Sequence, residues 1–242
     1  MFQATTSPRL FRTALALSVS LGLLTACGGG GGGGTPAPTG PVTSTLSFPL
    51  QTGYRALIAN GAANNFTISG TCAGSGNHTV GAANTATTFE GSAALSAAST
   101  WTMTFTNCTP SSTAATSTTY YDSNYIPRGF SSVGINYGVY LTAPTIPSSI
   151  MVGNTGTIGT ETLYTNSSKT VGNGTSVSSY VVEPDTATTA IINLVGRSYN
   201  ASGTLIATEQ DRYRIDAYGT LTPVSADIQY SYTSTTHLVF TF

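Results

Sequence analysis

Apolar and polar side chains alternate with a period of two along much of this chain. The clearest run covers residues 100–106, where Trp101, Met103 and Phe105 share one face and threonines occupy the other. Successive side chains of a strand point to opposite faces of a sheet, so this alternation predicts half-buried strands. The same pattern recurs in further groups: Leu46, Phe48 and Leu50; Phe66, Ile68 and Cys72; Ile135, Tyr137, Val139 and Leu141; Tyr213, Ile215 and Ala217; Ile228, Tyr230 and Tyr232; Leu238, Phe240 and Phe242.

Turn-forming residues separate these runs and leave little room for helices. The C-terminal part predicts an antiparallel meander with strands over Val177–Glu183, Thr188–Tyr199, Thr204–Tyr218 and Pro223–Tyr232. After the N-terminal segment, no stretch longer than ten residues carries a helical stripe, and Ala93–Ala98 is predicted to form at most one short helical turn. The predicted fold class is therefore all-β, and both a sandwich and a barrel fit the pattern.

The apolar faces are expected to supply the core, because the chain has few charged groups that could contribute instead. Burial of one large apolar side chain stabilises a fold by about 1.5–3 kcal/mol. The run that contains Ile192 and Leu194 is apolar on both faces. The predicted core residues are Trp101, Phe105, Ile135, Tyr137, Ile192, Leu194, Ile215 and Phe240.

The N-terminus has the pattern of an export signal. Arg9 and Arg12 precede an apolar run over residues 13–24, which is shorter than the roughly 20 residues that a membrane-spanning helix needs. The run ends in Leu24-Thr25-Ala26-Cys27, which resembles the lipobox of bacterial lipoproteins. In that family the cysteine thiol is acylated, for example with palmitate, and the chain is cut before the cysteine. The resemblance implies that Cys27 carries the lipid.

The residues after Cys27 predict a tether. Gly28–Gly34 is an unbroken glycine run and a proline-rich stretch follows it, so regular structure is disfavoured. In the lipoprotein family, Asp directly after the acylated cysteine retains the protein at the inner membrane. Gly28 stands there instead, and the resemblance therefore implies the outer membrane of a bacterial cell envelope. The predicted organisation is a signal peptide over 1–26, a tether over 27–45 and one all-β domain over 46–242.

Composition narrows the classes of function. The 242 residues include 44 Thr and 28 Ser, yet only 7% are charged and the net charge is −1. Such a composition excludes a coiled coil or helical bundle. Eight Lys and Arg residues without a cluster cannot neutralise a row of phosphates, so no nucleic-acid partner is expected. The expected partners are the membrane, through the N-terminal lipid, and a carbohydrate or another envelope protein.

Two cysteines remain for the domain. Cys72 and Cys108 in an exported chain favour a disulfide over two free thiols. They lie on opposite strand faces by parity, so a bulge or turn at Asn107 must bring them together. Neither His78 nor His237 has metal-ligand spacing to the cysteines, and we expect no metal site and no cofactor.

The sequence does not contain the common catalytic motifs. The patterns Gly-x-Ser-x-Gly, Ser-x-x-Lys and His-Glu-x-x-His are all missing. A serine hydrolase that uses His78 or His237 stays open as an alternative, but the many serines make a chance Ser–His contact easy. The missing motifs therefore favour a protein without catalysis.

Two pairs of acidic residues lie close together in the sequence. Glu183-Pro184-Asp185 and Glu209-Gln210-Asp211 each place two carboxylates two residues apart, as glycoside hydrolysis could use. Proline favours a turn for the first pair. Arg212 and Arg214 follow the second pair directly and favour an ion-pair lattice on the surface.

A group of polar aromatics is the best candidate for ligand contact. Tyr120, Tyr121, Asp122, Tyr125 and Arg128 lie together around turn residues. Aromatic rings with polar groups suit contact with a carbohydrate or peptide. The alternative is a hairpin whose tyrosines cover a sheet edge, with Asp122 paired to Arg128.

Three functions remain open from the sequence. The leading hypothesis is a non-catalytic lipoprotein of the outer membrane, acting as a binding or envelope-structural module. The second is a lipid-anchored hydrolase of polysaccharide or ester, which would need an acid pair or a Ser–His pair in one cleft. The third is an outer-membrane β-barrel component, because Leu238-x-Phe240-x-Phe242 resembles the closing strand of such barrels. A lipid-facing barrel would turn its apolar side chains outward, so the direction of Trp101 and Phe105 bears on this choice.

Overall fold

The computed structural model describes residues 42–132, 136–231 and 236–242, and these residues fold mainly into β-strands. The threonine, valine, isoleucine and tyrosine of the alternating runs favour a pleated, half-buried surface. The elements are α1 (Leu50–Asn60), β1 (Ala62–Gly70), β2 (Gly74–Val80), β3 (Thr85–Phe89), β4 (Ser92–Phe105), β5 (Ser112–Tyr121), β6 (Pro127–Ser132), β7 (Asn136–Tyr140), β8 (Thr155–Tyr164), β9 (Gly172–Pro184), β10 (Thr189–Tyr199), β11 (Leu205–Asp216), β12 (Leu221–Tyr230) and β13 (Thr236–Thr241).

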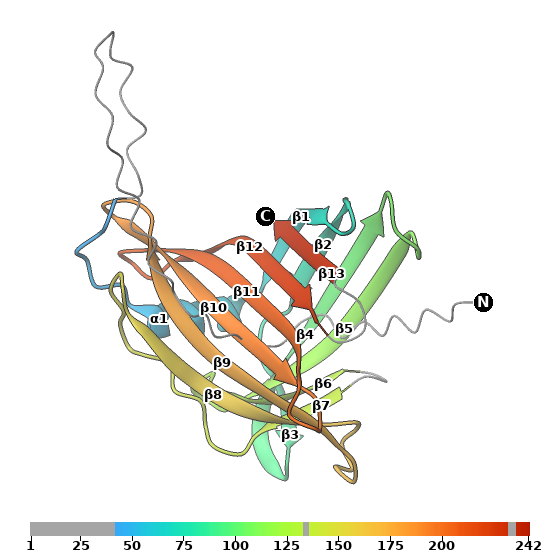
Figure 1. The fold of residues 1–242 in the computed structure, drawn as a ribbon. Helices are drawn as coiled ribbons and strands as arrows, with labels where there is room; N and C mark the ends of the chain where they lie inside the picture. The colour runs from blue at the N-terminus through green and yellow to red at the C-terminus, as the bar shows by residue number, and fades with distance from the viewer. Residues whose placement is uncertain (1–41, 133–135, 232–235) are drawn as a thin grey trace.

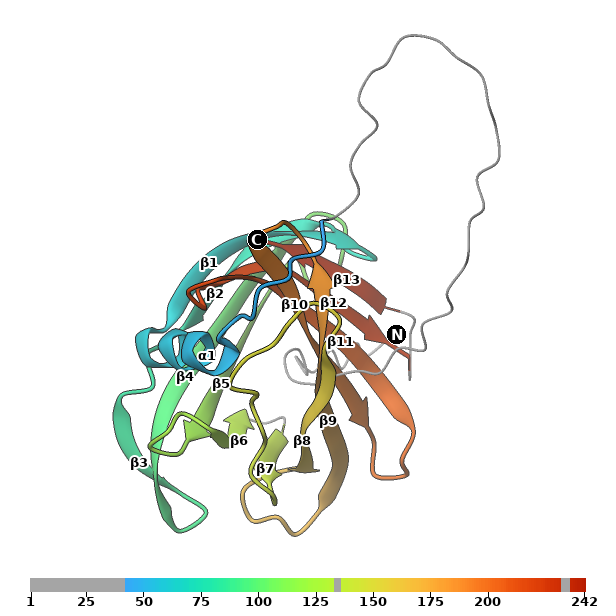
Figure 2. The same cartoon turned by 90° about the vertical axis from the view of Figure 1, so that its left-hand side faces the viewer.

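The strands form a closed antiparallel barrel of 12 strands (Figures 1 and 2). Neighbours follow the order β10-β11-β12-β13-β1-β2-β4-β5-β6-β7-β8-β9, and β9 returns beside β10. The remaining strand, β3, pairs only with β4. The all-β prediction and the C-terminal meander are confirmed, and the barrel rather than the sandwich is the architecture that forms.

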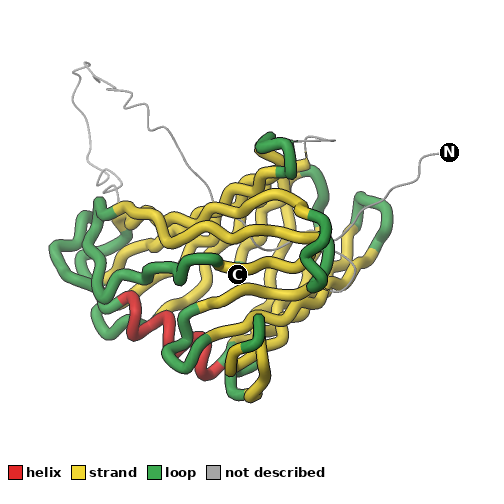
Figure 3. Tube along the Cα trace, turned by 90° about the horizontal axis from the view of Figure 1, so that it is seen from below, coloured by secondary structure: helices red, strands yellow, loops and turns green. Residues whose placement is uncertain are grey.

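The two ends of the barrel differ. The end that carries the β1–β2 turn (71–73) and the β4–β5 turn (106–111) also carries the disulfide, and we call it the disulfide end. The opposite end carries α1, the long 141–154 connection and the β9–β10 and β11–β12 turns, and we call it the helix end. Figure 3 shows α1 in red among the loops of that end.

Inward side chains at the disulfide end form an aromatic core. Trp101 on β4 and Phe240 on β13 are separated in the sheet by β2 and β1, yet their ring centroids lie 5.9 Å apart. They can meet only across the concave face. Phe66 lies between them, with centroids 5.3 Å from Trp101 and 5.2 Å from Phe240. The predicted apolar faces therefore point into the barrel.

The opposite faces of the same strands carry hydroxyl groups on the outside. One row crosses six neighbouring strands, with each member directly opposite the next; it consists of Ser225, Thr241, Thr67, Ser75, Thr104 and Ser112. All but Ser225 are exposed. Hydroxyl groups can bond to water from a pleated surface, so this face is compatible with an aqueous environment.

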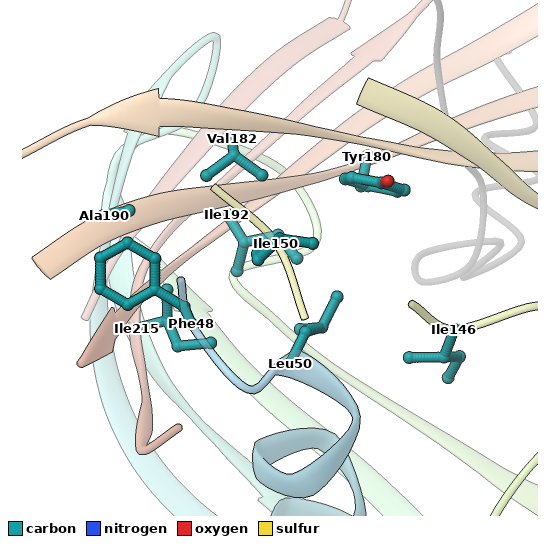
Figure 4. Close-up of a cluster of buried hydrophobic side chains, with 9 residues drawn as sticks. All are labelled: Phe48, Leu50, Ile146, Ile150, Tyr180, Val182, Ala190, Ile192 and Ile215. Carbon is teal, nitrogen blue, oxygen red and sulfur yellow. The ribbon is translucent and has the colours of Figure 1, made fainter. Parts of the chain in front are cut away.

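A second core fills the helix end (Figure 4). Phe48 and Leu50 and the 146–150 part of the long connection pack against the inward faces of β9, β10 and β11. The expected strand over Leu46, Phe48 and Leu50 is therefore wrong. Phe48 makes a single bridge with Ile150, and Leu50 begins α1. Phe48 and Leu50 are buried as expected, but they belong to a plug that enters the barrel and not to a wall strand, and Leu46 is exposed.

Helix α1 is the largest departure from the sequence prediction. It starts after Pro49 and ends before Gly61. The φ of Gly61 is 71°, a conformation that glycine adopts easily. Gly53 is buried on the inner side of α1, where a Cβ would lie 1.8 Å from the carbonyl oxygen of Gly219. This close approach explains a glycine inside a helix, and that glycine weakened the helical pattern.

The β3–β4 hairpin forms a small separate cluster on the outside of the barrel. Phe89 stacks on Tyr120 with ring centroids 4.4 Å apart and lies 5.4 Å from Tyr137. The Tyr137 hydroxyl donates to Glu90, and Lys169 also binds Glu90. The short helical turn expected over Ala93–Ala98 is wrong, because this segment belongs to β4 and its small side chains pack within the sheet.

Cys72 and Cys108 form the expected disulfide, with their Cα atoms 5.7 Å apart. Strand β4 ends at Phe105, so Cys108 lies in the turn beyond the strand and strand parity no longer applies to it. Asn107 accepts a hydrogen bond from the backbone N–H of Ala73 at 2.6 Å, which joins the two turns beside the disulfide.

The predicted core residues have different outcomes. Trp101, Ile192, Ile215 and Phe240 are buried inside the barrel, while Phe105 and Leu194 are partly buried against the same clusters. Tyr137 is buried too, but in the outer cluster with Phe89. Ile135 lies outside the described residues. The strand β10 is buried on both faces, as its sequence suggested.

We predict that Met103→Ala lowers the free energy of unfolding by about 2–5 kcal/mol, because Met103 is 2% exposed and packs in the aromatic core. The matched change Thr104→Ala, one residue along β4 and facing outward, should change it by only about 0.5 kcal/mol. Chemical denaturation with the disulfide intact measures both values. Similar losses for the two variants would contradict the inward and outward assignment.

Candidate functional site

A cavity of about 330 Å³ lies inside the barrel between the two cores. Its lining comes from strands all around the ring and from α1, and we call it the lumen cavity. The apolar part of the lining includes Trp101, Leu57, Ile158 and Leu194, whereas Ser99 and Ser117 supply hydroxyl groups. The space is thus mainly apolar with a few polar groups, as is usual for a small-molecule site.

His78 marks one wall of the lumen cavity. Its ring stacks on Trp101 with centroids 3.7 Å apart and planes inclined by 14°, and Nε2 lies 3.0 Å from Ser99 Oγ. Burial lowers the pKa of His78 to about 4, since the charged form would lose its hydration. At neutral pH this imidazole is uncharged, and it offers a flat polar surface to the cavity.

The facing wall carries Asp211 and Tyr213 from β11. Both share the inward face with Ile215, which lies in the core of the helix end. Burial raises the pKa of Asp211 to about 7. Burial is also the main cause of the raised pKa of Tyr213, and the charge of Asp211 adds to it. Asp211 is therefore a carboxyl group whose charge changes near neutral pH.

Two further carboxylates belong to the interior of the barrel. Glu161 on β8 is 2% exposed and Glu209 on β11 is 4% exposed. A Cβ on Gly138 would lie 2.8 Å from the Glu161 carboxyl carbon and 2.3 Å from the Phe130 ring, so the glycine leaves room for both side chains. The lumen thus combines acidic groups with aromatic rings.

The surface lattice expected for Glu209 and Asp211 is wrong for those residues, because both point inward. Their neighbours Arg212 and Arg214 point outward instead. The lattice forms with the other acid pair: Arg212 binds Glu183 at 3.3 Å and Arg214 binds Asp185 at 2.7 Å. Glu183-Pro184 ends β9 rather than forming a turn, which places these acids opposite the arginines.

The predicted aromatic group does not form one surface. Tyr121 is buried inside the barrel with Ile58 and Ala97, whereas Tyr120 lies outside against Phe89. Adjacent residues of one strand must face opposite ways, and this separates the two tyrosines. Contact of the whole group with a ligand stays a prediction, and of its five members Tyr121 lines the lumen cavity.

The other three members of that group lie in the β5–β6 turn and at the start of β6. Asp122 Oδ1 accepts hydrogen bonds from the backbone N–H groups of Asn124 and Ile126 at 2.8 and 2.9 Å. Tyr125 has a φ of 62° and packs partly against the Tyr121 cluster. The Nη1 of Arg128 donates to the carbonyl oxygen of Ala93 at 3.3 Å. Asp122 therefore holds a turn, and the alternative pairing of Asp122 with Arg128 is not among the ion pairs of the described residues.

The predicted lipid site, Cys27, lies outside the described residues, as do the signal segment and most of the tether. Within residues 42–132, 136–231 and 236–242, no group of three or more His, Cys, Asp or Glu side chains could hold a metal ion. The helical part of the described chain includes no segment that is both long and apolar enough to cross a membrane.

Comparison with known proteins adds no relative. No protein-family model, no curated protein and no solved structure matches this chain.

The sequence did not predict the lumen cavity, although the alternation of residues along a strand indicated part of its lining. Tyr213 and Ile215 were predicted to share an apolar face, and Asp211 lies two residues before Tyr213 on the same face. His78, Ser99 and Ser117 gave no comparable signal, because polar residues are common throughout the chain. Only the closure of the ring shows that these positions face one space.

We predict that Asp211→Asn removes a pH-dependent loss of stability. The folded-state pKa of about 7 lies above the usual value of 3.8, so the folded state binds the proton more tightly than the unfolded state. This contribution is full below about pH 4 and is lost as the pH rises through 7.

The free energy of unfolding of the wild type, taken relative to Asp211→Asn, should therefore fall by about 1–3 kcal/mol between pH 4 and pH 8. Urea denaturation across this range measures the difference. A constant difference would show that Asp211 titrates normally and does not face an enclosed space.

Proposed function

We propose that this protein is a lipid-anchored, exported binding protein whose barrel takes a small ligand in the lumen cavity. The anchor follows from the lipobox-like segment ending at Cys27, and its proposed location is the outer membrane. The ligand we favour is mainly apolar and carries at least one hydrogen-bonding group. The observation that carries the proposal is the cavity of about 330 Å³ inside the barrel, with polar groups on an apolar lining.

The size and lining of the cavity support binding. Small-molecule sites usually measure about 300–1,000 Å³ and combine apolar walls with few polar groups. The stacked pair of His78 and Trp101 offers a flat surface, and Ser99, Ser117 and Asp211 offer hydrogen bonds. Closed barrels of modest diameter use their interior in this way.

The outer face of the barrel favours this reading over an outer-membrane barrel component. A membrane barrel needs an apolar outer band about 25 Å tall. Across β12, β13, β1, β2, β4 and β5, the outward row described above is formed by serine and threonine. Such a row is better matched to water than to lipid chains.

A hydrolase is the second candidate, because His78 Nε2 lies 3.0 Å from Ser99 Oγ within the lumen cavity. A nucleophile and a base at hydrogen-bond distance are the minimum for acyl transfer. We rank it second because a histidine whose pKa is about 4 is a weak base at neutral pH. Labelling by a fluorophosphonate probe that is lost in Ser99→Ala would reverse this order.

We predict that cells fed an alkyne-tagged palmitate label the wild-type chain and not Cys27→Ala. The thiol of Cys27 is the acceptor that the lipobox resemblance implies. The change Cys72→Ala is the matched control, because this cysteine belongs to the disulfide and its loss should leave labelling intact. Labelling that persists in Cys27→Ala would overturn the anchor.

We predict that Ser117→Leu reduces ligand binding by at least about 10-fold, because the larger side chain fills part of the lumen cavity. The neighbouring Thr116→Leu places the same side chain on the outer face and should leave binding unchanged. A fluorescent fatty acid serves as the probe, and quenching of Trp101 by the probe gives the dissociation constant. Equal effects of the two changes, with both variants folded, would contradict binding in the lumen.

A further inference from the structure

Exposed apolar side chains gather at the helix end of the barrel. Among the described residues, six large hydrophobic side chains are clearly exposed, and five of them belong to segments of this end. We call these five the apolar rim: Val42 (49% exposed), Leu46 (38%), Leu141 (74%), Met151 (43%) and Tyr218 (87%). The sixth, Val171, lies in the β8–β9 turn at the other end of β8.

The segments that carry the apolar rim are joined to one another. Val42 forms a bridge with Asp185, and Ser44 Oγ donates to the carbonyl oxygen of Ala187, so residues 42–44 lie along the β9–β10 turn. Phe48 pairs with Ile150, which directly precedes Met151. The β11–β12 turn that carries Tyr218 touches the start of α1, because Gly219 lies against Pro49. The apolar rim is therefore a feature of one end rather than a set of scattered residues.

Three of the acids at this end are already engaged. Asp185 is bound to Arg214 at 2.7 Å. Asp216 accepts hydrogen bonds from the backbone N–H groups of Tyr218 and Thr220, and Asp122 is held in the β5–β6 turn in the same way. These acids have partners within the protein, which lowers the cost of bringing an interface close to them.

The chain enters the barrel at this same end. Val42 is the first described residue, and only residues 28–41 separate it from Cys27 in the sequence. A glycine-rich segment of this length has a root-mean-square reach of about 20 Å. A lipid on Cys27 would therefore keep the helix end, rather than the disulfide end, next to the bilayer.

We propose that the apolar rim docks on the surface of the bilayer that holds the lipid anchor. This inference rests on the proposed function, because the anchor supplies the proximity. Leucine, methionine and tyrosine side chains partition into the interfacial region of a membrane, and a tethered surface needs little affinity to remain there. Docking would turn the plugged end of the barrel toward the lipid and leave the disulfide end facing away from it.

Tryptophan placed at either end of the barrel tests the docking. The full acylated chain carries either Tyr218→Trp or, as the matched control, Val171→Trp, since both positions are exposed and lie in turns at opposite ends of the strands. Each is reconstituted in vesicles of phosphatidylethanolamine and phosphatidylglycerol with brominated acyl chains. Trp101 is buried in both variants, so the emission of the parent chain is subtracted. We expect brominated lipid to quench the tryptophan at 218 at least about two-fold more than the tryptophan at 171.

The outcomes separate docking from anchoring. If the acylated chain floats with the vesicles but both tryptophans are quenched equally or not at all, docking is overturned and the anchor stands. If the chain fails to float, the anchor fails and docking falls with it. If the emission at 218 shifts to the blue with protein concentration in the absence of vesicles, a second copy covers the apolar rim and docking on lipid is overturned.

Discussion

Closure of the sheet between β9 and β10 is the constraint on which the rest of this structure depends. An open sheet of this size would expose two rows of unpaired backbone groups, and the chain has few charged side chains with which to protect such edges. Joining the ends removes both edges. It also divides the side chains into one set that points out of the barrel and one set that points into it. Every later feature, from the aromatic core to the lumen cavity, follows from that division.

A ring of 12 strands encloses more space than the side chains of its own wall can fill. The chain fills part of it with segments that do not belong to the wall. At the helix end, α1 and the 146–150 stretch insert Leu50, Ile146 and Ile150 against β9, β10 and β11. At the disulfide end, aromatic rings from several strands meet across the interior. The lumen cavity is the space left between the inserted segments of the helix end and the aromatic rings of the disulfide end. Both therefore contribute residues to its lining.

The sequence predicted the strands well because alternation depends only on local geometry. Trp101, Met103 and Phe105 share a face whatever the overall architecture, and β4 shows that pattern directly. The same reasoning failed at Phe48 and Leu50, since alternating apolar residues cannot distinguish a wall strand from a plug that enters the lumen. The neighbouring arginines indicated a surface position for Glu209 and Asp211, although strand alternation gives both acids the inward face of Tyr213. The site could not be predicted further, because His78 and Asp211 become neighbours of one cavity only when distant strands close the ring.

The hydroxyl row on the outside of the barrel has a consequence for behaviour in solution. Repulsion between surface charges keeps most soluble proteins apart. At 0.1 M salt, dissolved ions screen this repulsion beyond a distance of about 10 Å. Here Thr241, Thr67, Ser75 and Thr104 meet the solvent through groups that hold water without charge. Ions have little on this face to screen. Its hydration should therefore change little between dilute and concentrated salt, and salt should do little to drive copies of the barrel together through this face.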